Sequence, residues 1–476
     1  MLLYNCDLIL PTQNRILVFP GADEVRAYDW AAAEKEYISL CLDNHLRLIL
    51  VNRFSQFDII VIPDPAKKGD AMLENWRVCG FDIHDTACRN KWEEAVIVDH
   101  TSQPAWVEAL AEGIALSNYQ FLKYYTKPED KKHSFSRLGI LNGDSGIIRR
   151  LNSRIHAVNL TRDLVNEPVS YLNAPQLGED LAVLCHETGI SVEILDKTQI
   201  ESLRMGGLLA VNKGSIDPPR FIILTWEPEH AVNDAPLVLV GKGVTFDTGG
   251  LSIKPTPGSM DEMKCDMAGA AAVAGTLIGM AGMGLPVRAI GLIPATDNRP
   301  DGNAYAPGDV IRMHNGSTVE VLNCDAEGRM ILADALSYAS KYQPDLVIDL
   351  ATLTGSAQVA IGSQGSVIMG TAPDDTFDQL IQAGYSVHER LVRFPLWDDY
   401  AKLIESEIAD VKNIGGRNAG AITAGKFLER FTAYPWIHID IAGTAFLPAR
   451  DSYRGLGGTG TGVRLLLDFI TKYYKL

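Results

Sequence analysis

Short apolar runs that alternate with helical patterns are the feature that most restricts the fold of this chain. In the C-terminal part these runs lie at Phe221–Leu224, Pro236–Val240, Val287–Ile293, Asp345–Leu350 and Trp436–Ile441. Strands that are apolar on both faces belong inside sheets that helices cover on both sides. The pattern therefore predicts an α/β domain with a central mixed, mostly parallel sheet flanked by helices.

The first 140 residues repeat this alternation on a smaller scale. Apolar runs occur at Arg15–Phe19, Leu46–Val51, Phe57–Ile62 and Ala95–Val98, and helical patterns at Val25–Leu42 and Ala105–Tyr125. A further helical pattern at 147–166 stops before Pro168, because proline ends helices. We therefore expect two α/β domains: an N-terminal domain at 1–140, a connecting helix at 141–168 and a larger C-terminal domain at 169–476.

Composition and charge exclude several classes of protein. The chain has 476 residues, of which 46% are hydrophobic and 21% charged, which is ordinary for a globular protein and excludes disorder and fibrous folds. Its formal net charge of −16 disfavours binding to nucleic acid through bulk charge, although a local basic patch is compatible with it.

The cysteines and the apolar segments favour the cytoplasm. The seven cysteines are an odd, scattered set without a CxxC pair, which argues against a disulfide framework or a thiolate zinc site. The ten histidines are also scattered, and we expect them at the surface or in the core rather than as ligands. Met267–Val287 has no charge but is mostly Ala and Gly, so it predicts a buried helix and no membrane partner.

Three segments place carboxylates and lysines beside glycines, where predicted strands end. They are Lys242–Lys254, Met263–Gly269 and Asn323–Arg329. In open α/β sheets, ligands bind beyond the carboxyl ends of the strands. Each segment alone also has an ordinary structural interpretation, such as a solvated lysine or a helix N-cap, and the combination is what points to a site.

Asp325 and Glu327 are two residues apart, between a predicted hairpin around Asn315-Gly316 and a helical pattern. In an extended segment both side chains would share one face. Clustered carboxylates require protons or metal ions to be tolerable. Oxygen ligands suit Mg²⁺, Mn²⁺ or Ca²⁺, whereas an added nitrogen ligand shifts the preference toward Zn²⁺, Mn²⁺ or Co²⁺.

The segment Asn-Cys-Asp-Ala-Glu-Gly-Arg at 323–329 resembles the signature of the leucyl (cytosol) aminopeptidase family, which usually has Thr in the second position. The other two segments resemble the remaining metal-site blocks of that family. Further matching motifs follow in family order at Arg162–Pro168, Asp349–Gly355, Asn413–Arg417 and His438–Thr444. The first 140 residues contain no such motif, as in a family whose N-terminal domain varies.

The resemblance implies a dinuclear metallo-aminopeptidase with two divalent ions, Zn²⁺ or Mn²⁺. Asp247 and Glu327 would bridge both ions, Asp325 would complete one site, and Lys242 and Asp266 the other. A lysine ligand must be a neutral amine, so the metal has to displace its proton. The family further implies peptide substrates with a free N-terminus and a homohexamer built as a dimer of trimers.

The resemblance also implies the catalytic groups. Two metals would activate a bridging water as hydroxide, and Lys254 would stabilise the oxyanion. Arg329 would hold bicarbonate, which would act as general base. The backbone around Thr352, Leu353 and Gly355 would line the site.

Two departures from the family pattern accompany these matches. Cys324 replaces the usual Thr beside a predicted ligand, and we interpret it as a small buried residue that points away from the metals. The loop that begins at Pro255 is one residue longer than usual. Neither departure removes a predicted ligand.

Other motifs are weaker. Gly143-Asp-Ser-Gly146 matches part of a trypsin-like motif but lacks the following Gly and a preceding all-β pattern. Gly455–Gly460 fits GxGxxG, but too little chain follows it for a dinucleotide-binding unit. A dinuclear phosphoesterase and a DNA-binding member of the family are the remaining alternatives. The absence of His beside the carboxylates argues against the first, and the charge of −16 against the second.

Overall fold

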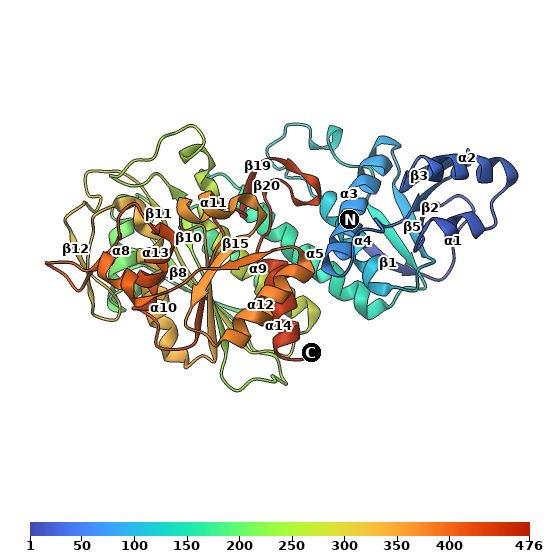
Figure 1. Cartoon of the computed structure of the whole chain (residues 1–476). Coiled ribbons are helices and arrows are strands. Elements are labelled where there is room, and N and C mark those ends of the chain that lie inside the picture. The colour runs from blue at the N-terminus through green and yellow to red at the C-terminus, as the bar shows by residue number, and fades with distance from the viewer. The chain divides into compact units, whose positions relative to one another are not determined.

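The computed structural model describes residues 1–476 and divides into two compact units. The first contains Met1–His156 with Ser386–His388 and Arg450–Gly455, and the second contains the rest of the chain. The division falls within helix α5 (Ser145–Asn166), which coincides with the long helical pattern in the sequence. Figure 1 shows the elements of both units along the chain.

The first unit is an α/β domain built on one sheet with the strand order β1-β6-β5-β2-β4-β3. All neighbouring strands are parallel except β3 and β4. The strands are β1 (Leu2–Cys6), β2 (Asn14–Val18), β3 (Leu48–Asn52), β4 (Phe57–Val61), β5 (Glu94–Asp99) and β6 (Arg137–Leu141). The helices are α1 (Ala22–Ala27), α2 (Ala32–Asp43), α3 (Asp70–Arg89), α4 (Pro104–Ser117) and the single turn η1 (Pro128–Asp130).

Helices α3 and α4 pack backbone against backbone. A Cβ added at Gly113 would lie 2.2 Å from the carbonyl oxygen of Arg77, and one added at Gly80 would lie 2.6 Å from that of Leu110. Arg77 also pairs with Glu112 across this contact, with 2.6 Å between Nε and Oε2. The two glycines thus explain how the helices approach so closely.

The second unit contains a mixed, mostly parallel sheet of nine strands, as predicted from the sequence. Its order is β16-β15-β18-β14-β9-β11-β8-β7, with β10 paired to β11. The strands are β7 (Ser191–Leu195), β8 (Arg220–Trp226), β9 (Leu237–Gly241), β10 (Gly243–Asp247), β11 (Ala289–Asn298), β14 (Leu346–Ala351), β15 (Ser366–Gly370), β16 (Leu391–Arg393) and β18 (Trp436–Asp440). The predicted hairpin is present as β12 (Val310–Arg312) and β13 (Thr318–Glu320), which β17 (Val411–Lys412) extends, and β19 (Phe446–Asp451) pairs with β20 (Gly455–Gly458).

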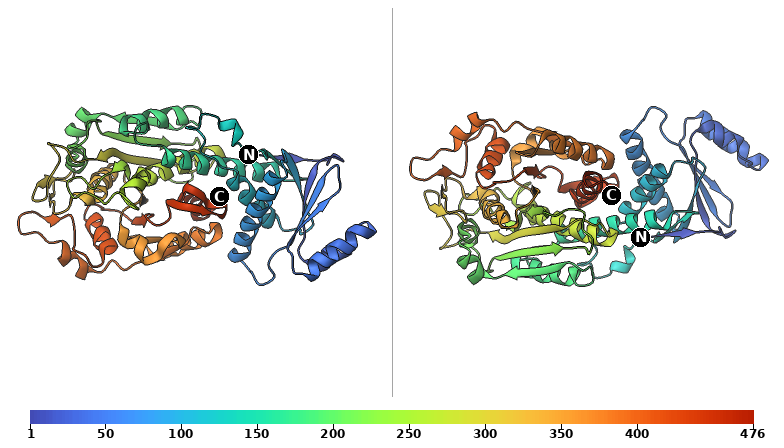
Figure 2. Two further views of the ribbon diagram at one scale, coloured as in Figure 1. Left: turned by 90° about the horizontal axis from the view of Figure 1, so that it is seen from above. Right: turned by 90° about the horizontal axis from the view of Figure 1, so that it is seen from below.

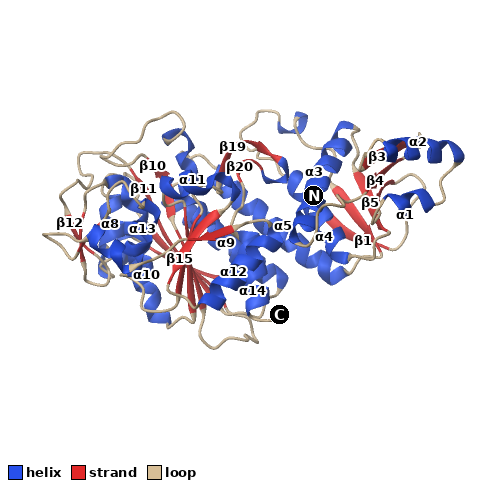
Figure 3. Ribbon diagram, in the orientation of Figure 1, coloured by secondary structure: helices blue, strands red, loops and turns tan.

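Helices cover both faces of this sheet (Figures 2 and 3). Gly291 of β11 faces Leu277 and Val273 of α9 (Ala268–Met283), whereas Ile290 and Leu292 belong to a core with residues of α8 and α10 on the opposite face. The helices are α6 (Ala174–Cys185), α7 (Lys197–Ser202), α8 (Gly206–Asn212), α9, α10 (Glu327–Ala339), α11 (Gly355–Ile361), α12 (Asp374–Val387), α13 (Gly420–Glu429) and α14 (Val463–Tyr473). Short 3₁₀ turns lie at η2 (Met260–Met267), η3 (Cys324–Ala326), η4 (Ser340–Tyr342), η5 (Gly362–Gln364) and η6 (Asp398–Ile404). The turn η7 (Ser452–Arg454) belongs to the first unit.

The charge-free stretch after Met267 forms α9, which is buried at almost every position. One helical stretch, Met260–Met283, is long and apolar enough to cross a membrane by length and composition, but 89% of its most apolar window is buried within the protein. This is the behaviour of a core helix, as expected from its Ala and Gly content.

Several predicted boundaries in the first unit are wrong. The helical pattern at Val25–Leu42 is two helices, because the chain turns at Trp30, whose indole donates to the Val25 carbonyl at 2.7 Å. The pattern at Ala105–Tyr125 ends at Ser117 in α4. Helix α3 was not predicted at all, and neither were the neighbouring strands β1 and β6.

Candidate metal centre

The predicted site residues of the second unit converge at the carboxyl ends of β9, β10 and β14. Lys242 lies in the tight connection between β9 and β10, and Asp247 is the last residue of β10. Asp266 belongs to the turn η2 that leads into α9. Asp325 lies in η3, and Glu327 begins α10. Ligand atoms of Asp247, Asp325 and Glu327 all lie within 4.8 Å of one another.

The segment that carries Asp325 is not extended, which corrects the sequence prediction. Cys324–Ala326 form a 3₁₀ turn, in which Asp325 has φ −86° and ψ 22°. Asn323 caps this turn through its side chain, which accepts from the Asp325 N–H at 2.8 Å. The turn, rather than a shared strand face, brings the carboxylates of Asp325 and Glu327 together.

Two lysines lie among these carboxylates. Nζ of Lys242 lies 2.7 Å from Oδ1 of Asp266 and 3.0 Å from Oε1 of Glu327. Nζ of Lys254 lies 2.9 Å from Oδ2 of Asp247 and also contacts Asp325. The lysines therefore divide the cluster into a Lys242 side and a Lys254 side.

Glycine at two positions permits this arrangement. A Cβ on Gly328 would lie 2.5 Å from Cε and 2.8 Å from Nζ of Lys242, so the lysine side chain passes directly over this residue. Gly249 has φ +84°, and its N–H donates to Oδ1 of Asp247 at 2.8 Å. The chain can thus turn back toward the site with Lys254.

Asp247, Asp266 and Glu327 are buried, Asp325 is partly buried, and all four carry perturbed pKa values. Burial and then the charge of Glu327 raise the pKa of Asp247, and the pKa of Asp266 is raised well above its usual range, first by burial. Burial followed by the charges of Glu327 and Asp247 raises the pKa of Asp325 to about 7. Burial acts to raise the pKa of Glu327 as well, but Lys242 and Lys254 together lower it.

The pKa values of the two ammonium groups are also raised, although burial alone acts to lower them. Burial acts to lower the pKa of Lys242, but Asp266, Glu327 and Asp247 outweigh it and raise that pKa. The carboxylates raise the pKa of Lys254 in the same way. The cluster is thus a buried group of four acids that holds positive charge strongly.

The donor set fits divalent cations. Oδ2 of Asp266 and Oε2 of Glu327 are buried oxygens without a hydrogen-bond donor. Buried carboxylate oxygens of this kind require a cation or a proton, and four carboxylates exceed the two ammonium charges beside them. A cation held by Asp266 and Glu327 on the Lys242 side would displace the proton of Lys242, leaving a neutral amine as a nitrogen ligand.

Arg329 and the segment 352–355 border the same cluster. Arg329 is buried and donates to the Asn413 carbonyl at 2.7 Å, while its Nε has no hydrogen-bond partner. Burial lowers the pKa of Arg329 to about 10. Thr352 accepts from Lys242 through its carbonyl at 2.8 Å and donates to Oδ1 of Asp266 at 2.9 Å.

Leu353 and Gly355 follow in the same turn. The Leu353 N–H donates to Oδ1 of Asp440 at 3.2 Å, and Gly355 begins α11 with open space where a Cβ would be. Thr354, between them, caps α11 and donates to Oδ2 of Asp440 at 2.7 Å. Asp440 therefore fixes this turn beside the cluster.

Two asparagines position the site and were not assigned from the sequence. Asn298, the last residue of β11, donates to Oδ1 of Asp247 at 2.8 Å and to the Cys324 carbonyl at 3.0 Å. The side chain of Asn413 bridges the turn that contains Asn323, donating to its carbonyl at 2.8 Å. The position of Asn298 at the end of a long apolar strand was the signal that could have revealed it.

His438 and Asp349 form a fully buried pair on neighbouring strands, with 2.6 Å between Nδ1 and Oδ1. Burial acts to lower the pKa of His438, but the Asp349 carboxylate outweighs it and raises that pKa. Trp436 donates to the other oxygen of Asp349 at 2.7 Å. Both residues lie in segments that match family motifs, and the pair supports β14 against β18.

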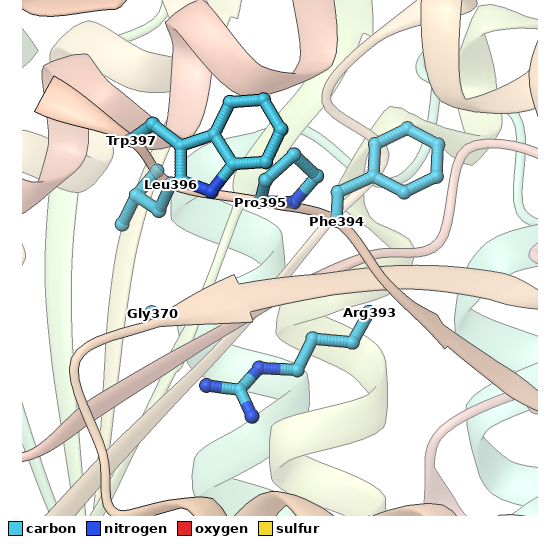
Figure 4. A pocket seen from close by; sticks show the side chains of 6 residues that line it. All are labelled: Gly370, Arg393, Phe394, Pro395, Leu396 and Trp397. Carbon is cyan, nitrogen blue, oxygen red and sulfur yellow. The ribbon is translucent and has the colours of Figure 1, made fainter. Parts of the chain in front are cut away.

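A groove of about 660 Å³ lies elsewhere in this unit. Figure 4 shows Phe394, Pro395, Leu396 and Trp397 along it, with Gly370 and Arg393. Gly370 ends β15, which runs antiparallel to β18, so the groove lies at the opposite ends of the strands from Asp247. It contains no carboxylate and is separate from the metal centre.

Comparison with known proteins identifies the family to which this constellation belongs. The family model described as "Cytosol aminopeptidase family, catalytic domain" matches residues 159–467. The chain belongs to the cytosol aminopeptidase family. It is therefore a leucyl aminopeptidase-type metalloexopeptidase, and every predicted site residue lies inside the matched region.

Curated relatives and solved structures agree with this assignment. A probable cytosol aminopeptidase of Syntrophotalea carbinolica is 48% identical over 373 residues, covering 76% of this chain and 74% of the relative. A probable cytosol aminopeptidase of Chlorobium phaeobacteroides is 46% identical over 384 residues, covering 77% of this chain and 75% of the relative. The bottromycin maturation enzyme BotP, in complex with Mn, is similar with a TM-score of 0.86 and 29% identity over 97% of this chain and all of BotP. A tomato leucine aminopeptidase mutant is similar with a TM-score of 0.86 and 26% identity, covering 99% of this chain and 96% of the tomato chain.

Proposed function

We propose that this aminopeptidase releases N-terminal amino acids from peptides at a two-metal centre, in which Asp247 and Glu327 would help to hold both ions. Asp325 would complete the ligands on the Lys254 side, and Lys242 and Asp266 those on the other. The observation that carries the proposal is the convergence of three carboxylates within 4.8 Å, with two lysines among them. When bound, the two ions would lower the pKa of water and polarise the scissile carbonyl.

The substrate would lie across the two sides of the cluster. We place its free α-amine on the side of Lys242 and Asp266 and its scissile carbonyl on the side of Lys254. Recognition of the free amine would make the enzyme an exopeptidase, because an internal peptide bond offers no such group.

Lys254 is the group we assign to the oxyanion. Its side chain is 15% exposed, whereas that of Lys242 is 3% exposed, so Lys254 can reach a substrate without leaving the carboxylates. The raised pKa keeps its ammonium charged at neutral pH. A charged donor aimed at the carbonyl oxygen stabilises the negative charge that develops there.

Arg329 is the group we assign to bicarbonate. Its buried Nε has no partner within the protein, which leaves one donor for an anion. Bicarbonate held there would act as the general base that moves the proton to the leaving amine. With two divalent ions, a hydroxide and a bicarbonate, the charges of the four carboxylates, Lys254 and Arg329 balance to zero, which suits a buried location.

The native ions would be Zn²⁺ or Mn²⁺, because the lysine amine adds a nitrogen ligand to an oxygen set. The Mn in the BotP complex supports the second choice. We also propose a cytoplasmic location and a homohexamer, in keeping with the family, and no role for nucleic acid.

The decisive experiment compares substrates on one metal-depleted preparation. Reloading with Zn²⁺ or Mn²⁺ should restore hydrolysis of aminoacyl-anilides, and a panel of anilides would give the preferred N-terminal residue. A nitrophenyl phosphate should remain intact under the same conditions. Turnover of the phosphate without turnover of any anilide would instead support a phosphoesterase. Full anilide activity without added metal would refute the two-metal centre.

A further inference from the structure

A second group of metal-ligating side chains lies in the first unit, apart from the carboxylates. His84 and Cys88 are one turn apart on α3, so they share a face of that helix. His133 comes from the segment between α4 and β6, and ligand atoms of the three residues lie within 4.8 Å of one another. The rings of His84 and His133 meet edge to face, with 4.9 Å between their centroids.

Asn118 orients both imidazoles. Nε2 of His84 lies 3.0 Å from Oδ1 of Asn118, and the ring of His133 interacts with the Asn118 backbone. Nδ1 of His133 is buried and has no hydrogen-bond partner. When His84 donates from Nε2 to Asn118, its Nδ1 keeps a lone pair 4.0 Å from Sγ of Cys88. Outer hydrogen bonds of this kind are what fixes metal-binding histidines.

The protonation states suit ligands. Burial lowers the pKa of His84 to about 4 and also lowers that of His133, so both rings are neutral at neutral pH. Burial raises the pKa of the Cys88 thiol, so a metal would displace its proton on binding. Two charged neighbours act on the pKa values of His84 and Cys88 in opposite directions: Asp85 acts to raise them and Arg450 to lower them.

The spacing matches zinc. Zn–S and Zn–N bonds of about 2.3 and 2.0 Å place the two ligand atoms of a tetrahedral site roughly 3.5 Å apart. Sγ of Cys88 lies 3.5 Å from Nε2 and 4.0 Å from Nδ1 of His84. Nδ1 of His84, which keeps its lone pair when Nε2 donates to Asn118, reaches a shared ion after a small side-chain adjustment.

We propose that His84, Cys88 and His133 bind one Zn²⁺ ion, with a water molecule as fourth ligand. The ion would connect α3 to the segment 118–136, which has little regular structure of its own. Gln120 already braces that segment, donating to the Lys131 carbonyl and accepting from the His133 N–H, both at 2.8 Å. The site would therefore stabilise the fold of the first unit, independently of the aminopeptidase reaction.

Cobalt tests this site in the enzyme that carries its catalytic metals. Co²⁺ bound by a thiolate gives a charge-transfer band in the near ultraviolet, and the ligands proposed for the catalytic centre include no thiolate. We expect the band at one Co²⁺ per chain in the wild type and its loss in Cys88→Ser. Cys79→Ser, which removes another thiol of α3, should keep it.

Alkylation provides a second measurement that needs no variant. Zn²⁺ should protect Cys88 from iodoacetamide at least about 10-fold, read by peptide mass spectrometry, while labelling of Cys79 stays unchanged. The absence of a thiolate band in the wild type, or a band that survives in Cys88→Ser, would overturn the proposal. Equal labelling of Cys88 with and without Zn²⁺ would overturn it as well.

Discussion

Lys254 and Lys242 lie among the same carboxylates but differ in what else holds them. Lys242 is fixed by Asp266, Glu327 and the Thr352 carbonyl, whereas Lys254 contacts only carboxylates at the more exposed edge of the cluster. The more exposed position of Lys254 suits a group that stabilises charge developing on the substrate. The deeper position of Lys242 suits a metal ligand. This contrast underlies the separate roles proposed for the two lysines.

Replacing Lys254 with Ala should abolish most turnover while both metals remain bound. Loss of one oxyanion donor typically lowers kcat by ~10²–10³, and a charged donor contributes at the upper end. Metal content by mass spectrometry should stay near that of the wild type, because the carboxylates are unchanged. If the metals are lost together with activity, Lys254 is structural and its proposed role is wrong.

Cys324 is fully buried, and its Sγ contacts the Tyr305 carbonyl at 3.2 Å. The sequence predicted a small buried residue here that points away from the metals; its burial is confirmed, although the segment is a 3₁₀ turn rather than a strand. The usual family Thr could donate to the same carbonyl. Cys324→Thr should therefore leave kcat/KM, metal preference and peroxide sensitivity almost unchanged. A marked shift in metal preference, or a gain in peroxide resistance, would contradict this.

At the scale of elements, the first turn of α10 carries one proposed ligand, Glu327, and leaves room for another, Lys242. Glu327 begins the helix, and Gly328 lies beneath the Lys242 side chain. Lys242 is tied at Nζ to three partners, so it cannot retreat easily from an added methyl group.

Gly328→Ala should therefore lower activity without weakening the fold. Alanine is the better helix former by about 1 kcal/mol, which offsets part of the strain from the displaced lysine, so thermal stability should change little. The displaced Lys242 should lower kcat/KM by about 10²-fold, as small misplacements at a reacting centre do. Gly302→Ala is the control, because nothing lies within 4 Å of a Cβ there. Normal activity in Gly328→Ala would show that Lys242 tolerates movement.

The limits of sequence prediction also appear at this scale. Interior strands such as β14 and β18 were predicted closely because continuous apolar runs identify them. Helix α3 escaped because Gly80 interrupts its pattern, and the contact with Gly113 that explains this glycine is long-range. The turn at Asp325 was also hidden, because two of the bonds that hold it come from Asn298 and Asn413, distant in sequence.

For the whole molecule, the proposed site residues follow from the resemblance of the sequence to family motifs, whereas the side chains that support them were not assigned from the sequence. In the first unit, too, the sequence shows only part of a cluster. His84 and Cys88 are four residues apart, but His133 comes close to them only in the folded chain. Scattered histidines in a sequence therefore say little about ligand clusters, and the expectation that they bind no metal becomes a question for experiment.

The family resemblance makes a definite prediction about the assembly of the whole molecule. A dimer of trimers with active sites facing an interior cavity would admit short peptides and exclude the termini of folded proteins. Sedimentation analysis should give six times the 52.0 kDa of one chain. At equal N-terminal residue, a short peptide should be cleaved far faster than the same terminus on a folded domain, since only the peptide can enter. Dilution that dissociates the assembly should then narrow this difference. A strict monomer with full activity would refute the assembly, and equal cleavage of both substrates by the intact hexamer would refute the enclosed cavity.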